Sequence, residues 1–317
     1  DKGNAIVDES VLKGITNIPE CVMIAEYFLI SKREAMLRNI LGKVGEDTRI
    51  HGYVNTNGAS TGRMTHSDPN MAQIPAVHKD KQGNILWGIE GGYGADFRNL
   101  FIAKPGYSVV GCDASGLELR MLAHYMNDEG YTNEILHGDI HTANQVAAGL
   151  QSRDQAKTFI YAFLYGGGDG KIGEIVGGKA QDGKRLKAKF LDNTPSLRTL
   201  RERVGTASKR GYLKGLDGRK IWIRSEHAAL NSLLQGAGAI VMKKALTILD
   251  DCATIAGLDY KFVGNIHDEY QTEVLKEHAD AFGVLAVEAI REAGQAFEMR
   301  CPLDGEYKVA LTWAGTH

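Results

Sequence analysis

The stretch VVGCDASGLELR (Val109–Arg120) joins an apolar strand to a helix and places Asp113 at the junction. A second aspartate, Asp268, stands in the stretch IHDEY (Ile266–Tyr270). Alternating apolar and polar residues on both sides of this second stretch predict a β-hairpin over 260–274. If the hairpin and the first strand share one sheet, the two carboxylates lie close enough to hold divalent cations.

Each aspartate also has an ordinary structural interpretation. Asp113 is well placed to cap the helix that follows it, and Asp-Glu pairs are common in hairpin turns. His267-Asp268-Glu269 also allows a His/Asp hydrolase, a class that we disfavour because we expect no nucleophile elbow of G-x-S-x-G form. A carboxylate pair that holds two Mg²⁺ ions favours phosphoryl transfer instead.

A helix over 152–166 carries the second chemical signal. Ser152 and Gln155 form a capping-box pattern at its start. Arg153, Lys157 and Tyr161 follow one face over an axial rise of about 12 Å, which suits a triphosphate followed by a sugar and a base. The positive end of the helix dipole adds to anion attraction near Arg153. An amphipathic helix with two solvated cations is the alternative.

Composition sets wider limits. The 317 residues are 43% hydrophobic, so the chain can bury a large core in two or three lobes. A net charge of −2 excludes a globally basic nucleic-acid binder but permits a local basic groove. The four cysteines form no C-x-x-C pair, which favours a reduced, cytoplasmic compartment. No apolar run approaches the roughly 20 residues of a bilayer span, so no membrane partner is expected.

The remaining pattern is a strand-bearing region interrupted by a helical insert. Helices are predicted over 19–41, 225–252 and 277–297, and residues 50–100 read as loops with short extended pieces. Residues 125–225 read as a helical block punctuated by glycine. Both aspartates belong to the strand-bearing region, and the cationic helix belongs to the insert.

Three strings resemble motifs A, B and C of the family A DNA polymerases, in family order: Asp113–Arg120, Arg153–Gly166 and His267–Glu269. The resemblance is greatest to the replicative polymerases of short-tailed phages and runs from about residue 50 to the last residue. The supporting strings are Thr61–Arg63, Asn70–Pro75, Gly138–Thr142, Gly215–Lys220 and His227–Gln235.

This resemblance implies an α+β, right-hand polymerase fold, with an antiparallel-sheet palm, helical fingers and a truncated thumb. The expected boundaries are a thumb remnant at 1–46, the first part of the palm at 47–124, fingers at 125–225 and the second part of the palm at 226–317. The implied enzyme is a DNA-directed DNA polymerase, a nucleotidyltransferase that adds dNTPs to the primer 3′ end of a primer–template DNA.

The resemblance also implies site residues. Asp113, Asp268 and the Ala114 carbonyl would bind two Mg²⁺ ions, with Mn²⁺ as an alternative, and Glu269 and Lys157 would complete the catalytic set. The nucleotide contacts would come from Glu118, His141, Arg153, Lys157, Tyr161 and Tyr165. The DNA contacts would come from Arg63, Gln73, Arg219, Asn231, Gln235 and His267.

Departures from the family pattern leave alternatives open. About 110 residues precede the first motif, too few for a complete thumb and a proofreading exonuclease. The chain could thus be a catalytic-core or DNA-binding subunit that is inactive until a second chain supplies those parts, or that works with other replisome proteins. A two-metal nuclease is a further alternative, but it has no use for the cationic helix. A phage-encoded protein would act in the host cytoplasm.

Overall fold

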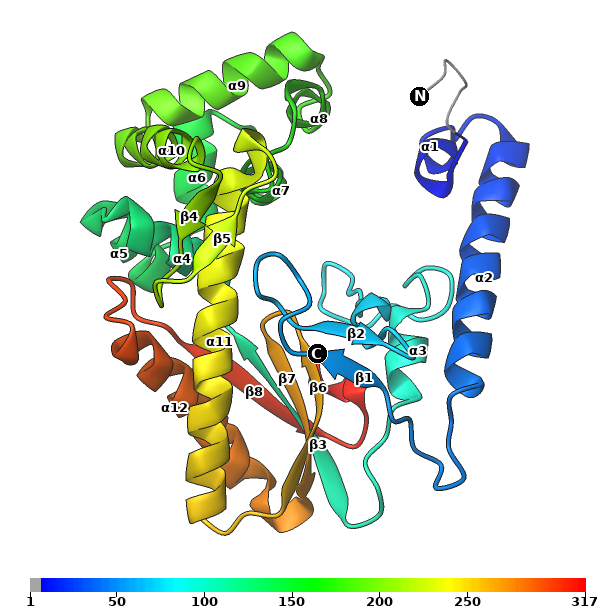
Figure 1. The fold of residues 1–317 in the computed structure, drawn as a ribbon. Coiled ribbons are helices and arrows are strands. Elements are labelled where there is room, and N and C mark those ends of the chain that lie inside the picture. The colour runs from blue at the N-terminus through cyan, green and yellow to red at the C-terminus, as the bar shows by residue number, and fades with distance from the viewer. Residues whose placement is uncertain (1–6) are drawn as a thin grey trace.

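The computed structural model describes residues 7–317, in which two helical arms rise from a base built on a sheet (Figure 1). The α-helices are α1 (Glu9–Lys13), α2 (Pro19–Leu41), α3 (Gly94–Asn99), α4 (Leu117–Met126), α5 (Glu129–His137), α6 (Ile140–Ala148), α7 (Arg153–Leu164), α8 (Asp169–Glu174), α9 (Ala180–Asp192), α10 (Pro195–Ser208), α11 (Ala229–Ile255) and α12 (Ala279–Ala296). The strands are β1 (Tyr53–Asn55), β2 (Thr65–Ser67), β3 (Tyr107–Ala114), β4 (Tyr212–Lys214), β5 (Lys220–Trp222), β6 (Tyr260–Ile266), β7 (Glu269–Leu275) and β8 (Gly305–Ala310). Short 3₁₀ turns are η1 (Met71–Gln73), η2 (Glu226–Ala228), η3 (Lys276–His278) and η4 (Trp313–Thr316).

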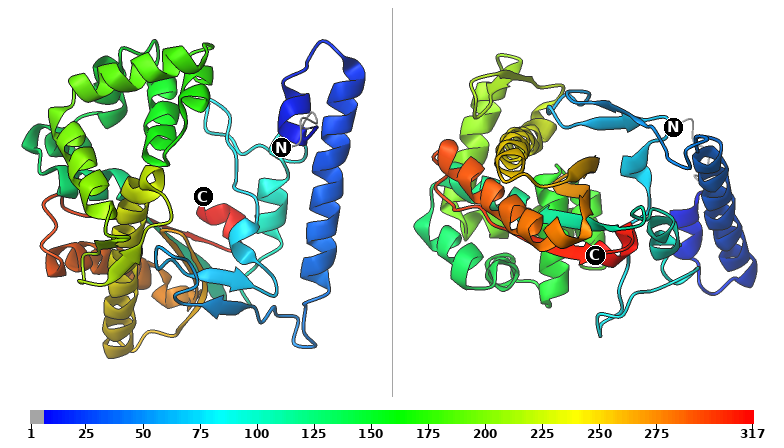
Figure 2. Two further views of the ribbon diagram at one scale, coloured as in Figure 1. Left: turned by 45° about the horizontal axis from the view of Figure 1, so that its top comes forward. Right: turned by 90° about the horizontal axis from the view of Figure 1, so that it is seen from below.

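The base is a four-stranded sheet in the order β6-β7-β3-β8, antiparallel throughout. Val110, Cys112 and Ala114 of β3 point to one face and are buried in the main core with residues of α11 and α12. α12 runs beside β8 (Figure 2). Because side chains alternate along a strand, Asp113 faces the opposite side, away from this core. The predicted α+β class with an antiparallel sheet is confirmed.

The left arm in Figure 1 is the helical block α5–α10. Phe159 and Phe163 on α7 pack edge-to-face on Phe190 of α9, with ring centroids 5.1 and 5.5 Å apart. The Ser152 hydroxyl accepts a hydrogen bond from the Gln155 amide at 3.2 Å, as the capping pattern predicts. The aromatic side of α7 is thereby fixed inward, which leaves Arg153 and Lys157 on its exposed side.

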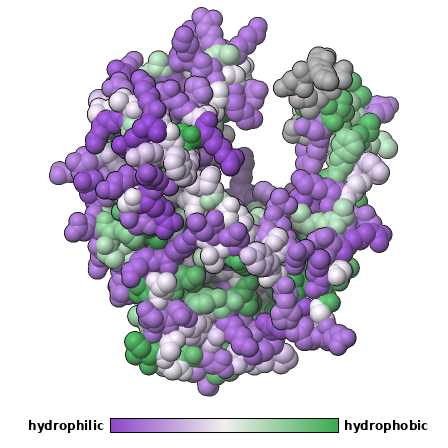
Figure 3. Space-filling model, in the orientation of Figure 1, coloured by the Kyte–Doolittle hydropathy of each residue, from purple (hydrophilic) through white to green (hydrophobic). Residues whose placement is uncertain are grey.

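The right arm consists of α1 and α2. The lower end of α2 joins a small core through Ile40, which clusters with Phe97 and Trp313. Higher up the helix, Met23 and Tyr27 are 67% and 66% exposed. Figure 3 shows the resulting hydrophobic surface on this arm and the open cleft that separates it from the helical lobe. The predicted helix over 19–41 is confirmed.

α11 is the longest helix and crosses the whole base. The segment Glu226–Ile255 has the length and hydropathy of a membrane-spanning helix, but 61% of its apolar window is buried. It packs against α12, α4 and α10. Its apolar composition is therefore accounted for by core packing.

Two strand pairs were missed by the sequence patterns. β8 was not predicted, because its alternating residues Glu306, Tyr307, Lys308 and Val309 are half-buried or exposed at the sheet edge. The β4–β5 hairpin lies inside the block that was predicted to be helical, so that assignment is wrong for 212–222. Its three-residue strands are too short for periodicity to reveal.

The packing of α8 on α9 gives a test of the helical lobe. A Cβ on the buried Gly183 would lie 2.0 Å from the Asp169 carbonyl oxygen, whereas a Cβ on Gly170 meets nothing within 4 Å. We therefore expect Gly183→Ala to lower the free energy of unfolding by about 1–3 kcal/mol. Gly170→Ala, the matched control, should leave it unchanged or raise it by up to about 1 kcal/mol. Thermal melting measures both, and a Gly183→Ala protein as stable as the wild type would contradict this packing.

Candidate active site

The sheet brings the two aspartates together. Asp113 pairs with Glu269 across β3 and β7, and the Ala114 amide donates a hydrogen bond to the Asp268 carbonyl at 3.1 Å. Although Asp113 is exposed at the end of β3, the surrounding protein excludes much of the bulk water. This burial and the charges of Asp268, Glu269 and Glu306 raise the pKa of Asp113 to about 7. Burial also raises the pKa of Asp268, against the opposing charge of Arg63.

Glu269, in contrast to the two aspartates, is surrounded by hydrogen-bond donors and basic side chains. Its carboxylate accepts hydrogen bonds from the Trp313 indole at 2.9 Å and from the Gln271 amide at 2.5 Å. The Arg98 guanidinium is 3.9 Å away and stacks over the Trp313 ring at 4.4 Å, and His317 Nε2 lies 3.5 Å from Glu269. These partners contact both carboxylate oxygens of Glu269 and hold its side chain in place beside Asp113.

The carboxylate pair fits divalent cations. Within residues 7–317 there is no group of three or more His, Cys, Asp or Glu side chains in metal-ligand geometry. Mg²⁺ does not require one, because it commonly takes one or two carboxylates and completes its shell with water and substrate phosphates. The raised pKa of Asp113 is the supporting observation, since two neighbouring carboxylates that repel each other are stabilised by a cation between them.

The cationic face of α7 carries one paired and one unpaired cation. Arg153 Nε donates to Asp139 Oδ2 at 2.6 Å, and Asp139 also caps α6 by accepting from the His141 amide at 3.0 Å. Lys157 is exposed, and no hydrogen bond or ion pair holds it within the part of the chain that the structure describes. Burial and the charges of Arg153 and Lys157 lower the pKa of His141. The Tyr161 ring lies 6.3 Å from that imidazole.

Glu118 links the base to the helical lobe. The Tyr165 hydroxyl donates to Glu118 at 2.8 Å, and Arg63 Nη2 lies 3.4 Å from the same carboxylate. Tyr165 stacks on Tyr161 with ring centroids 6.5 Å apart. Burial raises the pKa of Tyr161, and the charges of Glu118 and Asp268 raise it further. The structure thus joins the predicted nucleotide-binding residues of α7 to those of the base.

The predicted DNA-binding residues are more dispersed. Arg219 donates to Asp217 at 2.7 Å in the β4–β5 turn. His267 is exposed in the β6–β7 turn with a φ of 60°. The other residues of this set, apart from Arg63 described above, are Gln73 on η1 and Asn231 and Gln235 on α11. Gln73 is exposed, and both α11 side chains are partly accessible.

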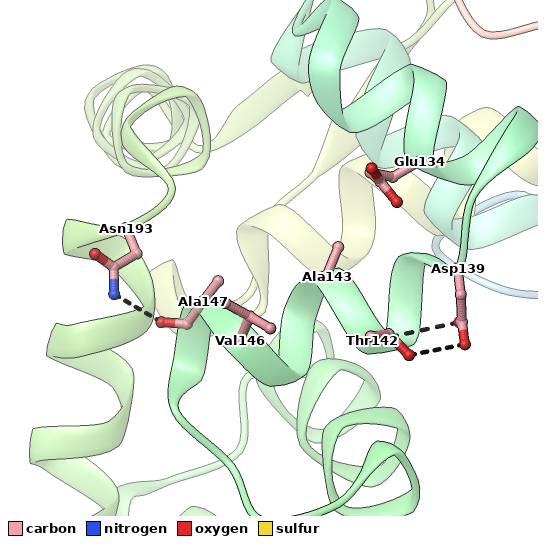
Figure 4. Close-up of a pocket in the computed structure, with 7 residues that line it drawn as sticks. All are labelled: Glu134, Asp139, Thr142, Ala143, Val146, Ala147 and Asn193. Atoms are coloured by element: carbon pink, nitrogen blue, oxygen red, sulfur yellow. Dashed lines mark hydrogen bonds between the residues drawn. The ribbon is translucent and has the colours of Figure 1, made fainter.

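Neither Asp113 nor Asp268 lines either of two hollows in the part of the chain that the structure describes. One, of about 710 Å³, opens on the outer side of α6, where Glu134, Asp139, Thr142 and Asn193 line it (Figure 4). The other, of about 530 Å³, lies behind the end of α7 and is lined by residues that include Phe163. Asp139, which lines the first hollow, also binds Arg153 of the predicted nucleotide-binding set.

Sequence reasoning missed several contacts and one string. Asp139 belongs to the string Gly138–Thr142, but no role was predicted for it. No local sequence pattern indicates that Trp313 and Arg98 lie against Glu269. The expectation that the chain has no G-x-S-x-G string is wrong, because Gly58–Gly62 has this form. This string lies in the turn between β1 and β2, not between a strand and a helix, so it is no nucleophile elbow.

Comparison with known proteins gives consistent matches. Residues 1–315 match the protein family described as DNA polymerase family A. The DNA-directed DNA polymerases of Enterobacteria phage T3 and Escherichia phage T7 are each 43% identical over 355 residues, covering 100% of this chain and 49% of theirs. The chain therefore spans about half the length of these curated relatives.

A solved structure matches as well. It is the POL domain of Pol1 from M. smegmatis in complex with DNA primer-template and dNTP. The TM-score is 0.85 at 22% identity, and the match covers 100% of this chain and 57% of the other. At this identity the likeness shows a shared fold.

The raised pKa of Asp113 predicts how stability depends on pH. The folded state disfavours the ionised form of Asp113, so ionising this residue lowers the free energy of unfolding. This loss of stability is absent below about pH 4, grows as the pH rises and is complete above about pH 7. We expect Asp113→Asn, without divalent ions, to raise the melting temperature at pH 8 and to have no effect at pH 4. Asp251→Asn, which changes an exposed acid on α11, is the control. An equal effect of Asp113→Asn at both pH values would contradict the carboxylate repulsion.

Proposed function

The chain belongs to DNA polymerase family A, and we propose that it extends a primer 3′ end with dNTPs under the direction of a template. The observation that carries this proposal is the carboxylate pair Asp113 and Asp268, whose field reaches Tyr161 on the helix that also bears Arg153 and Lys157. A nuclease needs the carboxylates but has no use for Arg153 and Lys157 on one helix face.

We also propose where each part of this activity lies in the chain. We assign 47–124 and 226–317 to the palm, 125–225 to the fingers and 1–46 to a thumb remnant, of which the structure describes 7–46. The four-stranded sheet and α11 then form the floor, and the helical lobe and the α1–α2 arm form the walls of the cleft in Figure 3.

Asp113, Asp268 and the Ala114 carbonyl are the proposed ligands of two Mg²⁺ ions, with Mn²⁺ as an alternative. When bound, such ions lower the pKa of an attacking hydroxyl and neutralise charge on the departing phosphate. The β3–β7 ladder keeps the two carboxylates in place before any ion arrives, so little reorganisation is required at the moment of reaction. Glu269 keeps this end of the ladder anchored to Trp313.

The triphosphate is assigned to the exposed face of α7. Arg153 uses Nε for Asp139, which leaves its two terminal amino groups to meet phosphate oxygens. Lys157 supplies an unpaired charge one turn further along and can give a proton to the leaving pyrophosphate. His141 can donate a hydrogen bond from its ring to a phosphate oxygen.

The sugar and base are assigned to the next turn of the helix. Tyr165 and Arg63 hold the Glu118 side chain, which can then exclude a ribose 2′-hydroxyl by its bulk. Tyr161 would lie beside the 3′ position and Tyr165 at the nascent base pair. The remaining polar side chains assigned to the primer–template are Gln73, Arg219, Asn231, Gln235 and His267. They can donate hydrogen bonds to the minor-groove acceptors that all base pairs share.

A second candidate function is a core subunit that is inactive alone. One observation favours it: Met23 and Tyr27 on the α1–α2 arm are 67% and 66% exposed. A second chain that supplies further thumb and exonuclease parts, or another replisome protein, would cover that arm. Because the T3 and T7 relatives are phage proteins, we place either activity in the host cytoplasm.

Primer extension by the isolated chain, with Mg²⁺ and dNTPs, tests the main proposal. We expect template-dependent lengthening of the primer, and we expect Asp113→Ala and Asp268→Ala to abolish it while primer–template binding persists. Asp251→Ala serves as the control for a lost surface carboxylate. Extension near the wild-type rate in either active-site variant would refute the two-metal assignment. Extension that appears only after a host or phage extract is added would favour the subunit.

The triphosphate assignment is tested by dNTP titration. Arg153→Ala and Lys157→Ala each remove a charge-assisted contact worth about 1.5–3 kcal/mol, so the KM for dNTP should rise by roughly 10- to 150-fold. DNA affinity should stay near that of the wild type. Lys171→Ala removes an exposed lysine of the same lobe, on α8, and is the control. A loss of DNA affinity without a change in KM for dNTP would show that α7 binds DNA instead.

A further inference from the structure

The β4–β5 hairpin presents an outward face whose role the proposed function leaves unassigned. It stands in front of α11 at the foot of the helical lobe (Figure 1). Tyr212 pairs with Trp222, and Lys214 pairs with Lys220, so all four side chains share one face. The intervening residues, Leu213 and Ile221, are 3% and 2% exposed and anchor the opposite face in the main core.

The aromatic end of this face is open to solvent. The Tyr212 and Trp222 rings meet at a centroid distance of 5.7 Å and an angle of 64°, and Trp222 is 64% exposed. Lys220 Nζ lies 4.8 Å from the Tyr212 centroid, and Arg210 Cζ lies 4.9 Å from it. Most of the Trp222 ring is therefore free to contact a ligand, beside the basic side chains of the same face.

The other end of the face concentrates positive charge. Lys214 and Lys220 stand directly opposite each other, and a like-charge pair in this position destabilises a hairpin. Asp217, the acid of the connecting turn, is already engaged by Arg219 at 2.7 Å. The lysine pair therefore lacks an anionic partner on its own hairpin, within the chain that the structure describes, and a bound anion would relieve its repulsion.

The lysine end of the hairpin lies next to the candidate active site. A Cβ placed on Gly62 would be 3.4 Å from Arg219 Nη1. The next residue, Arg63, contacts Glu118. A strand that crosses the outward face could thus continue, past Arg219 and the 61–63 loop, into the active site.

We propose that the outward face of β4–β5 binds single-stranded nucleic acid, with one unpaired base stacked on Trp222 and Tyr212 and phosphates held by Lys214 and Lys220. Stacking on aromatic rings beside a basic track is the general means of binding unpaired strands. A duplex does not fit this chemistry, since its base faces are covered by their neighbours. The inference rests on the proposed function, in which the strand is the unpaired template ahead of the primer end.

The test uses the full chain and two primer–templates that differ only in the template overhang, about 2 or about 12 unpaired nucleotides. We expect Trp222→Ala and Tyr212→Ala to weaken binding of the long-overhang DNA about tenfold or more. Binding and extension of the short-overhang DNA should be unchanged. Trp222→Phe should restore most of the affinity because it keeps a stacking ring, and Lys214→Ala should lower the salt dependence of binding.

Trp87→Ala, which removes a Trp that is 49% exposed elsewhere, is the matched control, and unchanged melting temperatures confirm that the variants fold. An equal loss on both substrates, or no loss on either, would overturn the platform. Binding is measured separately from extension. A wild-type chain that extends neither DNA but binds the long overhang through Trp222 would refute the proposed function and leave the platform standing.

Discussion

The ladder between β3 and β7 is the constraint on which the candidate site depends. It holds Asp113 beside Glu269 and within the field of Asp268, although these charges repel one another. The arrangement persists because the other face of the same strand is buried: Val110 and Cys112 are 1% and 2% exposed against α11 and α12. The free energy gained by apolar burial on one face of β3 thus offsets the electrostatic repulsion on the other face. A bound divalent cation would relieve that repulsion.

A second coupling joins the base to the helical lobe. Glu118 belongs to the helix that follows β3, and the Tyr165 that binds it belongs to the helical lobe. The Arg153–Asp139 pair lies wholly within that lobe, so it fixes Arg153 independently of the base. A movement of the lobe relative to the sheet would therefore break Tyr165–Glu118 while Arg153 and His141 travelled together. This separation between contacts within the lobe and the contact to the base suits the proposed function, in which a closing lobe would carry a nucleotide toward the aspartates.

Local patterns predicted the long elements well. Periodicity predicted α2 and α12, the apolar run predicted β3, and the capping pattern predicted the start of α7 within one residue. The same methods missed β8 and the β4–β5 hairpin. β8 lies at a sheet edge, where few residues are buried, and the hairpin strands span three residues each. In both cases the strand is defined by its partner, and a partner is not visible in a local window.

The sequence by itself determined the chemistry on offer: two strand-end aspartates, a helix with Arg153 and Lys157 one turn apart, and their order along the chain, which suffices to indicate the family. Only the tertiary structure decided how these residues are used. It paired Arg153 with Asp139, left Lys157 without a partner among residues 7–317, and closed Trp313 and Arg98 around Glu269. The reason is physical: residue types and spacing fix charge and local geometry, whereas pKa shifts and hydrogen-bond partners depend on contacts between segments that fold together from distant parts of the chain.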